Sequence, residues 1–164
     1  MKLLIGMAFA ALAATPAHGS PPPQAQESPL RGTWTLVAAD KILPGGGQVR
    51  DYGSSPKGRL IVDAQGRYSL QIFKSERLRF AGDKNDGSAD EFASAALGSS
   101  THYGTVSVDA KQGVLVFRIE GASYPNWEGI EQKRTYALKG GLLSYRVPAR
   151  PDGSVPISVW RRLD

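Results

Sequence analysis

The lengths of the connections between strand-like segments constrain the fold of this chain more than any single motif. Eight segments place apolar residues at every second position, a pattern typical of half-buried strands; they are residues 33–38, 59–63, 67–73, 102–109, 114–120, 132–138, 142–147 and 155–162. The connections between them are alternately long and short, and each short one contains glycine. Because successive connections of an antiparallel meander lie at opposite ends of the sheet, all the long ones fall at one end.

This alternation predicts an all-β protein, an eight-stranded antiparallel up-and-down barrel with tight hairpins at one end and an open mouth at the other. A barrel of eight strands can hold one small ligand. One short helix, residues 89–97, is predicted between strands 3 and 4, because Ser88 and Glu91 form a capping-box pattern and Gly98 can end the helix in a left-handed conformation. We expect the long loop that carries this helix to act as a lid over the mouth.

The N-terminal residues are predicted to lie outside the folded domain. Lys2, the apolar run of residues 3–14 and the small residues after it are typical of a signal peptide over residues 1–19, cleaved after Ala17 or Gly19. Residues 20–29 are rich in proline and indicate a linker, which leaves residues 30–164 as the barrel domain. A periplasmic or secreted location follows as an expectation. The chain has no cysteine, so its stability must come from packing without disulfides.

Charge and motifs exclude several classes of function. The net charge of +5 comes from scattered basic residues without an aromatic-basic stripe, which argues against nucleic-acid binding. The chain has no Gly-x-Ser-x-Gly elbow, phosphate loop or spaced metal ligands, so no catalytic residue, metal or cofactor is predicted. No transmembrane segment is expected after cleavage of the signal. The oligomeric state is left open.

Short motifs at both ends of the domain add a family resemblance. Gly32-Thr33-Trp34 resembles the Gly-x-Trp signature of lipocalins, and Arg161-Arg162 resembles the basic residue that packs over that tryptophan. The stretches DYGSSPKGRLIVDAQGRYSLQI, YPNWEGIEQKRTY and ISVWRR resemble the bacterial and fungal lipocalin-like domain family, over about residues 30–163. The resemblance implies a calycin-type barrel in which Trp34 stacks on Arg161, or alternatively on Arg162, at the closed end.

Strand alternation and loop position select the candidate ligand-binding residues. Those on strands are expected to point into the barrel, and two lie on a mouth loop; together they are Arg134, His102, Tyr145, Tyr68, Gln132, Phe117, Tyr124 and Trp127. Trp160 shares its side of the last strand with Ser158 and is predicted to point outward. An isolated histidine at a strand start, such as His102, is more often a structural residue held by hydrogen bonds than a catalyst.

A buried arginine charge is costly without a partner, so Arg134 must meet an opposite charge or a hydrogen-bond acceptor inside the barrel. One explanation pairs it with Glu120 or with a strand-end carbonyl as a structural plug. The other has it meet the anionic head of a ligand, such as a carboxylate. The sequence therefore predicts a binding protein for a small apolar molecule that can carry an anionic group. The alternatives are a cofactor-free isomerase or cyclase using His102, Glu120, Tyr145 and Arg134, or an envelope interaction protein with a filled core.

Overall fold

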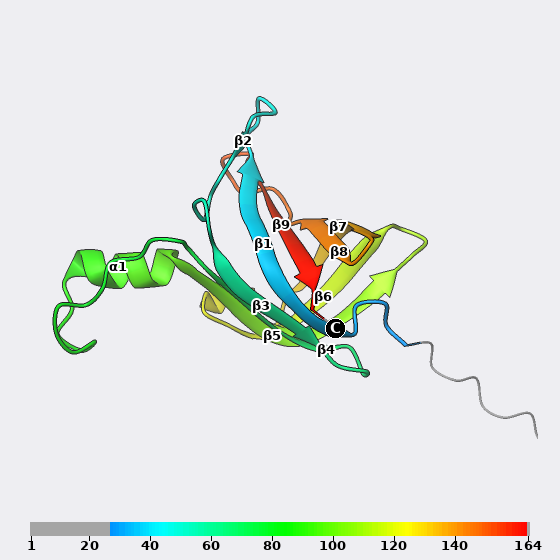
Figure 1. Ribbon diagram of the computed structural model, residues 1–164, viewed down its shortest axis with the longest axis horizontal. Coiled ribbons are helices and arrows are strands. Elements are labelled where there is room, and N and C mark those ends of the chain that lie inside the picture. The colour runs from blue at the N-terminus through cyan, green and yellow to red at the C-terminus, as the bar shows by residue number, and fades with distance from the viewer. Residues whose placement is uncertain (1–26, 164) are drawn as a thin grey trace, which may run out of the picture.

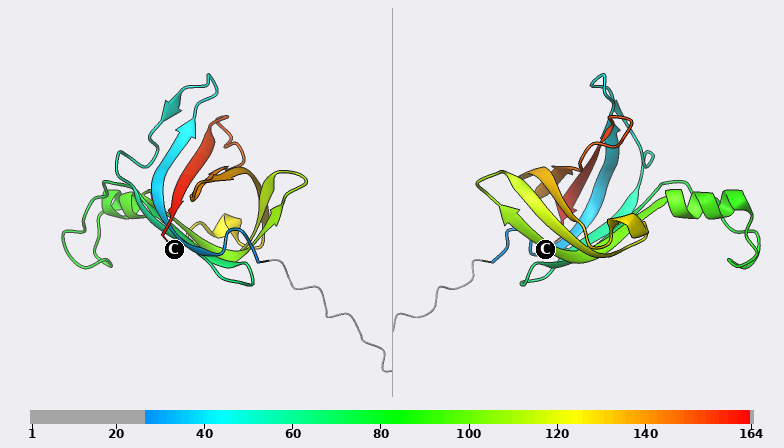
Figure 2. Two further views of the ribbon diagram at one scale, coloured as in Figure 1. Left: turned by 45° about the vertical axis from the view of Figure 1, so that its right-hand side comes forward. Right: turned by 180° about the vertical axis from the view of Figure 1, so that it is seen from behind.

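The chain forms one antiparallel sheet that closes on itself into a barrel (Figures 1 and 2). The computed structural model describes residues 27–163. Neighbouring strands follow the order β2-β1-β3-β4-β5-β6-β7-β8-β9, and β1 also pairs with β9 to close the ring. The elements are β1 (Gly32–Ile42), β2 (Gln48–Val49), β3 (Lys57–Val62), β4 (Arg67–Phe73), α1 (Ala89–Leu97), β5 (Ser99–Asp109), β6 (Val114–Ala122), the 3-10 turn η1 (Pro125–Trp127), β7 (Glu131–Lys139), β8 (Leu142–Arg146) and β9 (Val155–Arg162). The predicted all-β closed antiparallel barrel of eight strands with one helix is confirmed.

The position of the helix in the strand order differs from the prediction. The helix follows β4 and precedes β5, whereas it was expected between strands 3 and 4. The difference arises from β2, which the sequence did not predict and which moves every later strand one place along in the order. This strand has two exposed residues, and they pair with the end of β1. Two exposed residues leave no alternation of apolar side chains, so the sequence pattern could not reveal this strand. The predicted signal peptide and most of the predicted linker lie outside the described residues.

Helix α1 begins with the capping box that the sequence predicts. The Ser88 side chain accepts a hydrogen bond from the backbone of Glu91, and the Glu91 carboxylate accepts one from the backbone of Ser88. The expected left-handed conformation of Gly98 is wrong, because its φ is −88°. Glycine is needed there for space instead: a Cβ would lie 2.4 Å from the carbonyl oxygen of Ser94 and 2.7 Å from the side chain of Arg77.

The helix does not act as a lid over the barrel. It projects away from the strands beyond the start of β5 (Figure 1), and none of its residues is buried. Its residues do not line the barrel cavity described below. Within residues 27–163, no helix is long and apolar enough to cross a membrane.

The isolation of this helix makes its cap a local stability element. A Ser88→Ala substitution removes the N-cap acceptor and is expected to cost about 1 kcal/mol of helix stability. We expect faster amide hydrogen exchange across α1 and unchanged exchange in the barrel strands. Equal acceleration in β5 and β6 would show instead that the helix supports the barrel.

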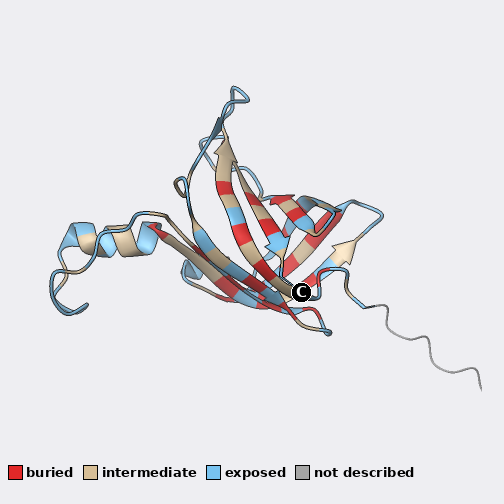
Figure 3. Ribbon diagram, viewed as in Figure 1, coloured by how far each residue is buried: buried red, intermediate tan, exposed pale blue. Residues whose placement is uncertain are grey.

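The barrel core follows the alternation of the strands (Figure 3). On β6, Leu115, Phe117 and Ile119 are buried while Arg118 and Glu120 are exposed. The outward placement of Trp160 is wrong, because Trp160 is fully buried on the same side of β9 as buried Ser158. Ser158 is polar because it faces a cavity, so its polarity does not mark an outward side of β9.

The closed end of the barrel is built around Trp34. Its indole nitrogen donates a 2.9 Å hydrogen bond to the carbonyl of Leu30, and its ring is fully buried. The guanidinium of Arg162 lies 4.2 Å from the ring centre, so Arg162 and not exposed Arg161 is the stacking partner. Arg162 also donates to the carbonyl oxygen of Pro29 at 2.5 Å, which ties the entering chain across the closed end.

The pairing of β5 with β6 contains a bulge close to the residues that line the mouth of the barrel. The register of the two strands shifts between Tyr103 and Gly104. Gly104 has a φ of 153°, and a Cβ at this position would lie 2.0 Å from the carbonyl oxygen of Arg118. Only glycine fits this close approach of two backbones. The bulge lies two residues from His102, where β5, which begins at the mouth, leaves the mouth half of the barrel.

Candidate functional site

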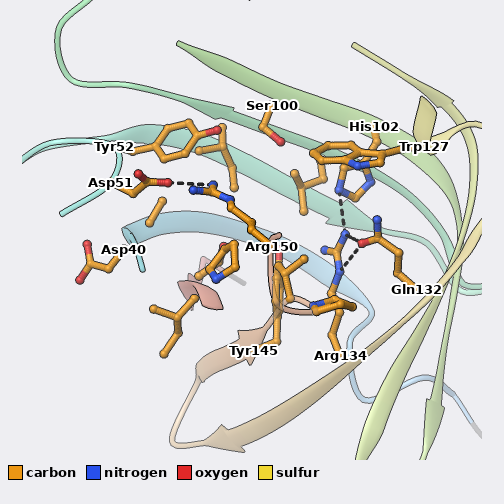
Figure 4. Close-up of a pocket in the computed structure, with 18 of the residues that line it drawn as sticks. Asp40, Asp51, Tyr52, Ser100, His102, Trp127, Gln132, Arg134, Tyr145 and Arg150 are labelled. Atoms are coloured by element: carbon orange, nitrogen blue, oxygen red, sulfur yellow. Dashed lines mark hydrogen bonds and ion pairs between the residues drawn. The ribbon is translucent and has the colours of Figure 1, made fainter. Parts of the chain in front are cut away.

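A cavity of about 410 Å³ opens at the mouth of the barrel, at the end that holds the long connections. This volume lies at the small end of the range for small-molecule sites. Apolar and aromatic side chains form most of its wall, with a few polar groups among them (Figure 4). The polar and charged residues that line it are Asp40, Asp51, Ser100, His102, Gln132, Arg134, Arg150 and Ser158.

Arg134 of β7 lies in the wall of this cavity and is only 3% exposed. Its Nε and Nη2 donate to the Gln132 side-chain oxygen, at 3.3 and 2.8 Å, and Nη2 also contacts Nε2 of His102 at 3.3 Å. Its guanidinium carbon lies 4.1 Å from the ring centre of Phe117 and 5.1 Å from that of Tyr145. The predicted partner Glu120 is wrong, because Glu120 is exposed on the outside of β6.

No carboxylate balances the charge of Arg134 among the described residues. The ion pairs found there join other residues, and none of them includes Arg134. Burial lowers the pKa of Arg134, and the nearby Tyr145 and Tyr68 partly offset that shift. Since a guanidinium stays protonated in proteins, the cavity wall carries a positive charge held only by neutral partners and ring faces.

The neutral state of His102 follows from its surroundings. Burial, together with the neighbouring charge of Arg134, lowers the pKa of His102 to about 3. Arginine can only donate, so Nε2 of His102 is the acceptor and the ring proton is on Nδ1. Nδ1 then donates to the Tyr68 hydroxyl at 2.7 Å. His102 is therefore a neutral side chain that bridges Arg134 and Tyr68 through one contact at each ring nitrogen.

This environment predicts the titration of His102 and its effect on stability. The imidazole is expected to stay neutral down to about pH 3, because burial and the charge of Arg134 oppose protonation while Tyr68 and Trp127 supply no charge. The unfolded chain takes up the proton near pH 6.5, so His102 lowers the free energy of unfolding as pH falls below 6.5 toward 3. Imidazole NMR chemical shifts against pH measure this directly. A His102 midpoint above pH 6 would contradict it.

Tyr145 brings a second unpaired polar group to the cavity. The residue is 2% exposed and lines the cavity wall, and its hydroxyl has no hydrogen-bond partner of good geometry among the described residues. Its ring also contacts Phe117 at 5.8 Å between centroids. A buried polar group without a partner costs about 1–3 kcal/mol, so such groups are rare unless a ligand or water meets them.

Aromatic side chains form one side of the mouth. Trp127 of η1 packs edge-to-face on His102 at 6.0 Å and on Tyr124 at 5.5 Å. All three residues line the cavity, and their rings pack against one another at the rim to form an apolar edge to the opening. Tyr52, from the β2–β3 connection, also lines the cavity but lies beside Asp51 (Figure 4).

Charged residues that the sequence did not single out lie on the other side of the mouth. Asp51 pairs with Lys41 of β1 at 3.1 Å and with Arg150 of the β8–β9 connection at 2.9 Å. The bonds from these two cations outweigh burial, which alone would raise the pKa of Asp51, and hold that pKa below its usual value. Figure 4 shows the Arg150 side chain extending to Asp51 beside the cavity. For Asp51 and Arg150, the only signal in the sequence was their position in two long connections at the mouth end.

The structure brings most of the candidate residues together. Six of the eight line the cavity, and they are Arg134, His102, Tyr145, Gln132, Tyr124 and Trp127. Phe117 and Tyr68 lie behind this wall, where Phe117 packs on Arg134 and Tyr68 bonds to His102. Within residues 27–163, no cluster of three His, Cys, Asp or Glu residues is arranged to hold a metal ion.

The closed barrel and its lined cavity define a small antiparallel β-barrel of the calycin type. A family model described as the lipocalin-like domain matches residues 31–163. The chain belongs to this lipocalin-like family, whose fold suits small hydrophobic ligands. A search of curated proteins found no match. A crystal structure of a mutant of the fluorescent protein UnaG is similar at 15% identity, covers 82% of this chain and 96% of that one, and superposes with a TM-score of 0.36.

Proposed function

We propose that this protein binds a small apolar molecule with an anionic group in the barrel cavity, with Arg134 as the counter-charge. The observation that carries the proposal is the buried Arg134 charge, which has neutral partners and no carboxylate among the described residues. A ligand anion in the cavity would supply the missing opposite charge. The signal-like N-terminal sequence adds the proposal that the protein acts in the periplasm or after secretion.

The composition of the cavity wall supports an apolar body for this ligand. Leu70, Ile72, Val147 and Ile157 line the cavity together with the aromatic rim. Burying apolar surface contributes about 25 cal/mol per Å², so the wall favours an apolar molecule and the single charge orients it. The cavity also argues against the alternative of a barrel filled by its own side chains.

The enzyme alternative has less support from the arrangement of the titratable groups. Glu120 is outside the barrel, and His102 uses both ring nitrogens in contacts with Arg134 and Tyr68. A neutral imidazole with a pKa of about 3 is a weak base at neutral pH. We therefore assign binding, and no chemical step, to this cavity.

A fluorescence titration with dansylglycine, a compact aromatic acid, tests the proposal. We expect saturable binding of one molecule per chain with a blue-shifted emission, because the dansyl ring enters an apolar cavity. Mass spectrometry of the protein isolated under native conditions is run beside it to detect a copurified molecule. Absence of both saturable binding and a copurified molecule would overturn the proposal.

A pair of variants on β1 controls for the location of binding. Ala39 is buried in the cavity wall, whereas Val37 is the exposed extra residue of the bulge between β1 and β9. Ala39→Phe is expected to abolish dansylglycine binding by filling the cavity, and Val37→Phe to leave it unchanged. If Ala39→Phe does not fold, Ser158→Leu fills the cavity from β9, where Ser158 pairs with Ala39 and also lines the cavity. Equal binding by filled and control variants would place the probe outside the barrel.

A further inference from the structure

The cavity wall contains hydrogen-bond donors that the protein itself leaves unused. Nε and Nη2 of Arg134 are occupied by Gln132 and His102, while Nη1 makes no hydrogen bond to a described residue. The hydroxyl of Tyr145 is likewise buried and makes no hydrogen bond of good geometry within residues 27–163; it lies near enough to the Arg134 guanidinium to stabilise that charge, and its ring centre is 5.1 Å from the guanidinium carbon. The amide nitrogen of Gln132 is a third donor, since only its oxygen bonds to Arg134.

We infer that Arg134 Nη1 and Tyr145 Oη form a two-point clamp for a carboxylate, and that the ligand is a compact aromatic carboxylic acid. The inference rests on the proposed function and names the class of molecule bound. One carboxylate oxygen would accept from Arg134 and the other from Tyr145, with Gln132 beside them. A carboxylate offers about four acceptor positions on its two oxygens, and these three donors can occupy three of them.

The number of charges and donors favours a carboxylate over other anions. Arg134 is the one buried cation of the cavity wall among the described residues; the side chain of Arg150 is 39% exposed and already paired with Asp51. A phosphate dianion would bring a second negative charge that nothing buried there balances. A sulfonate carries a third oxygen and a tetrahedral shape, which demand more donors and more room. A neutral alcohol would leave the Arg134 charge uncompensated.

The rest of the wall favours a ring over a long acyl chain. Rigid aromatic side chains surround the opening, where Trp127, His102 and Tyr124 already pack edge-to-face. The prolines Pro148, Pro151 and Pro156 also line the cavity. Aromatic rings gain about 0.5–1.5 kcal/mol from such contacts beyond the area they bury. The volume of about 410 Å³ suits a compact molecule.

Calorimetric titration with four probes tests the clamp and the ring separately. Three share one ring system and are 2-naphthoate, 2-naphthalenesulfonate and the neutral 2-naphthalenemethanol, and the fourth is decanoate. We expect 2-naphthoate to bind at least about tenfold more tightly than each of the others. Tyr145→Phe should weaken 2-naphthoate by about tenfold and leave 2-naphthalenemethanol unchanged. Tyr103→Phe, on the exposed outer face of β5, is the matched control and should change neither.

The outcomes separate failure of the clamp from failure of the proposed function. If 2-naphthoate binds no better than 2-naphthalenemethanol or 2-naphthalenesulfonate, the carboxylate clamp is wrong while binding in the cavity stands. Tighter binding of decanoate would overturn the aromatic ligand class. If none of the four binds, the proposed function fails with the inference. The comparison among ligands uses the wild-type protein, so it decides the question even if Tyr145→Phe does not fold.

Discussion

An Arg134→Met variant is expected to lose about 10- to 100-fold in affinity for dansylglycine while its affinity for neutral dansylamide changes little. The loss corresponds to a hydrogen bond to a charged group, worth about 1.5–3 kcal/mol. Arg134 is the buried cation of the cavity, and methionine keeps much of its length without the charge. Parallel fluorescence titrations with the two probes measure the difference.

The stability of this variant provides its control. Methionine removes the cost of burying a charge, and the open cavity lets water reach the groups of Gln132 and His102 that Arg134 had bonded. We therefore expect the variant to unfold at the same urea concentration as the wild type or above it. Arg134→Lys should give an intermediate affinity, because it keeps the charge and loses the planar contacts with Phe117. An equal loss for both probes would mean that Arg134 shapes the cavity and does not recognise the anion.

Trp34→Ala should produce the largest loss of stability, about 3–5 kcal/mol in the free energy of unfolding. The substitution removes a fully buried ring, its hydrogen bond to Leu30 and its contact with Arg162. A domain of ordinary stability has only about 5–15 kcal/mol in total, so the variant should be close to unfolding at 37 °C. Urea unfolding followed by circular dichroism measures the change.

Trp127→Ala is the matched control at the opposite end of the barrel. Trp127 is only partly buried and packs on His102 and Tyr124 at the rim. Its loss should leave the unfolding free energy nearly unchanged and weaken dansylglycine binding. A Trp34→Ala variant that unfolds within 1 kcal/mol of the wild type would show that the closed end contributes little to stability.

The sequence predicted the barrel well because its signals are local and repeated. Alternation and glycine turns at each hairpin are independent indications of the same topology, and the mouth end follows from loop lengths alone. Errors occurred where a side chain departs from the pattern for a functional or packing reason. Ser158 faces the cavity, and Trp160 was therefore assigned to the wrong side of β9.

The candidate site was predictable in part for a related reason. Strand alternation placed Arg134, Gln132 and His102 inside the barrel, and the structure brings them into hydrogen-bonding contact. The partners of Arg134 depend on which strands are adjacent and in what register, which alternation does not specify. The contact between Asp51 and Arg150 joins residues 99 positions apart in two long connections, so no local pattern could reveal it.

A crystal structure of the protein saturated with 2-naphthoate tests whether Arg134 and Tyr145 hold a carboxylate in the cavity. It should show one molecule in the cavity, with carboxylate oxygens within about 3 Å of Arg134 Nη1 and Tyr145 Oη. The naphthalene ring should lie toward Trp127 and the rim. An empty cavity in a saturated crystal, or a ligand bound only on the outer face of the barrel, would contradict this mode of binding.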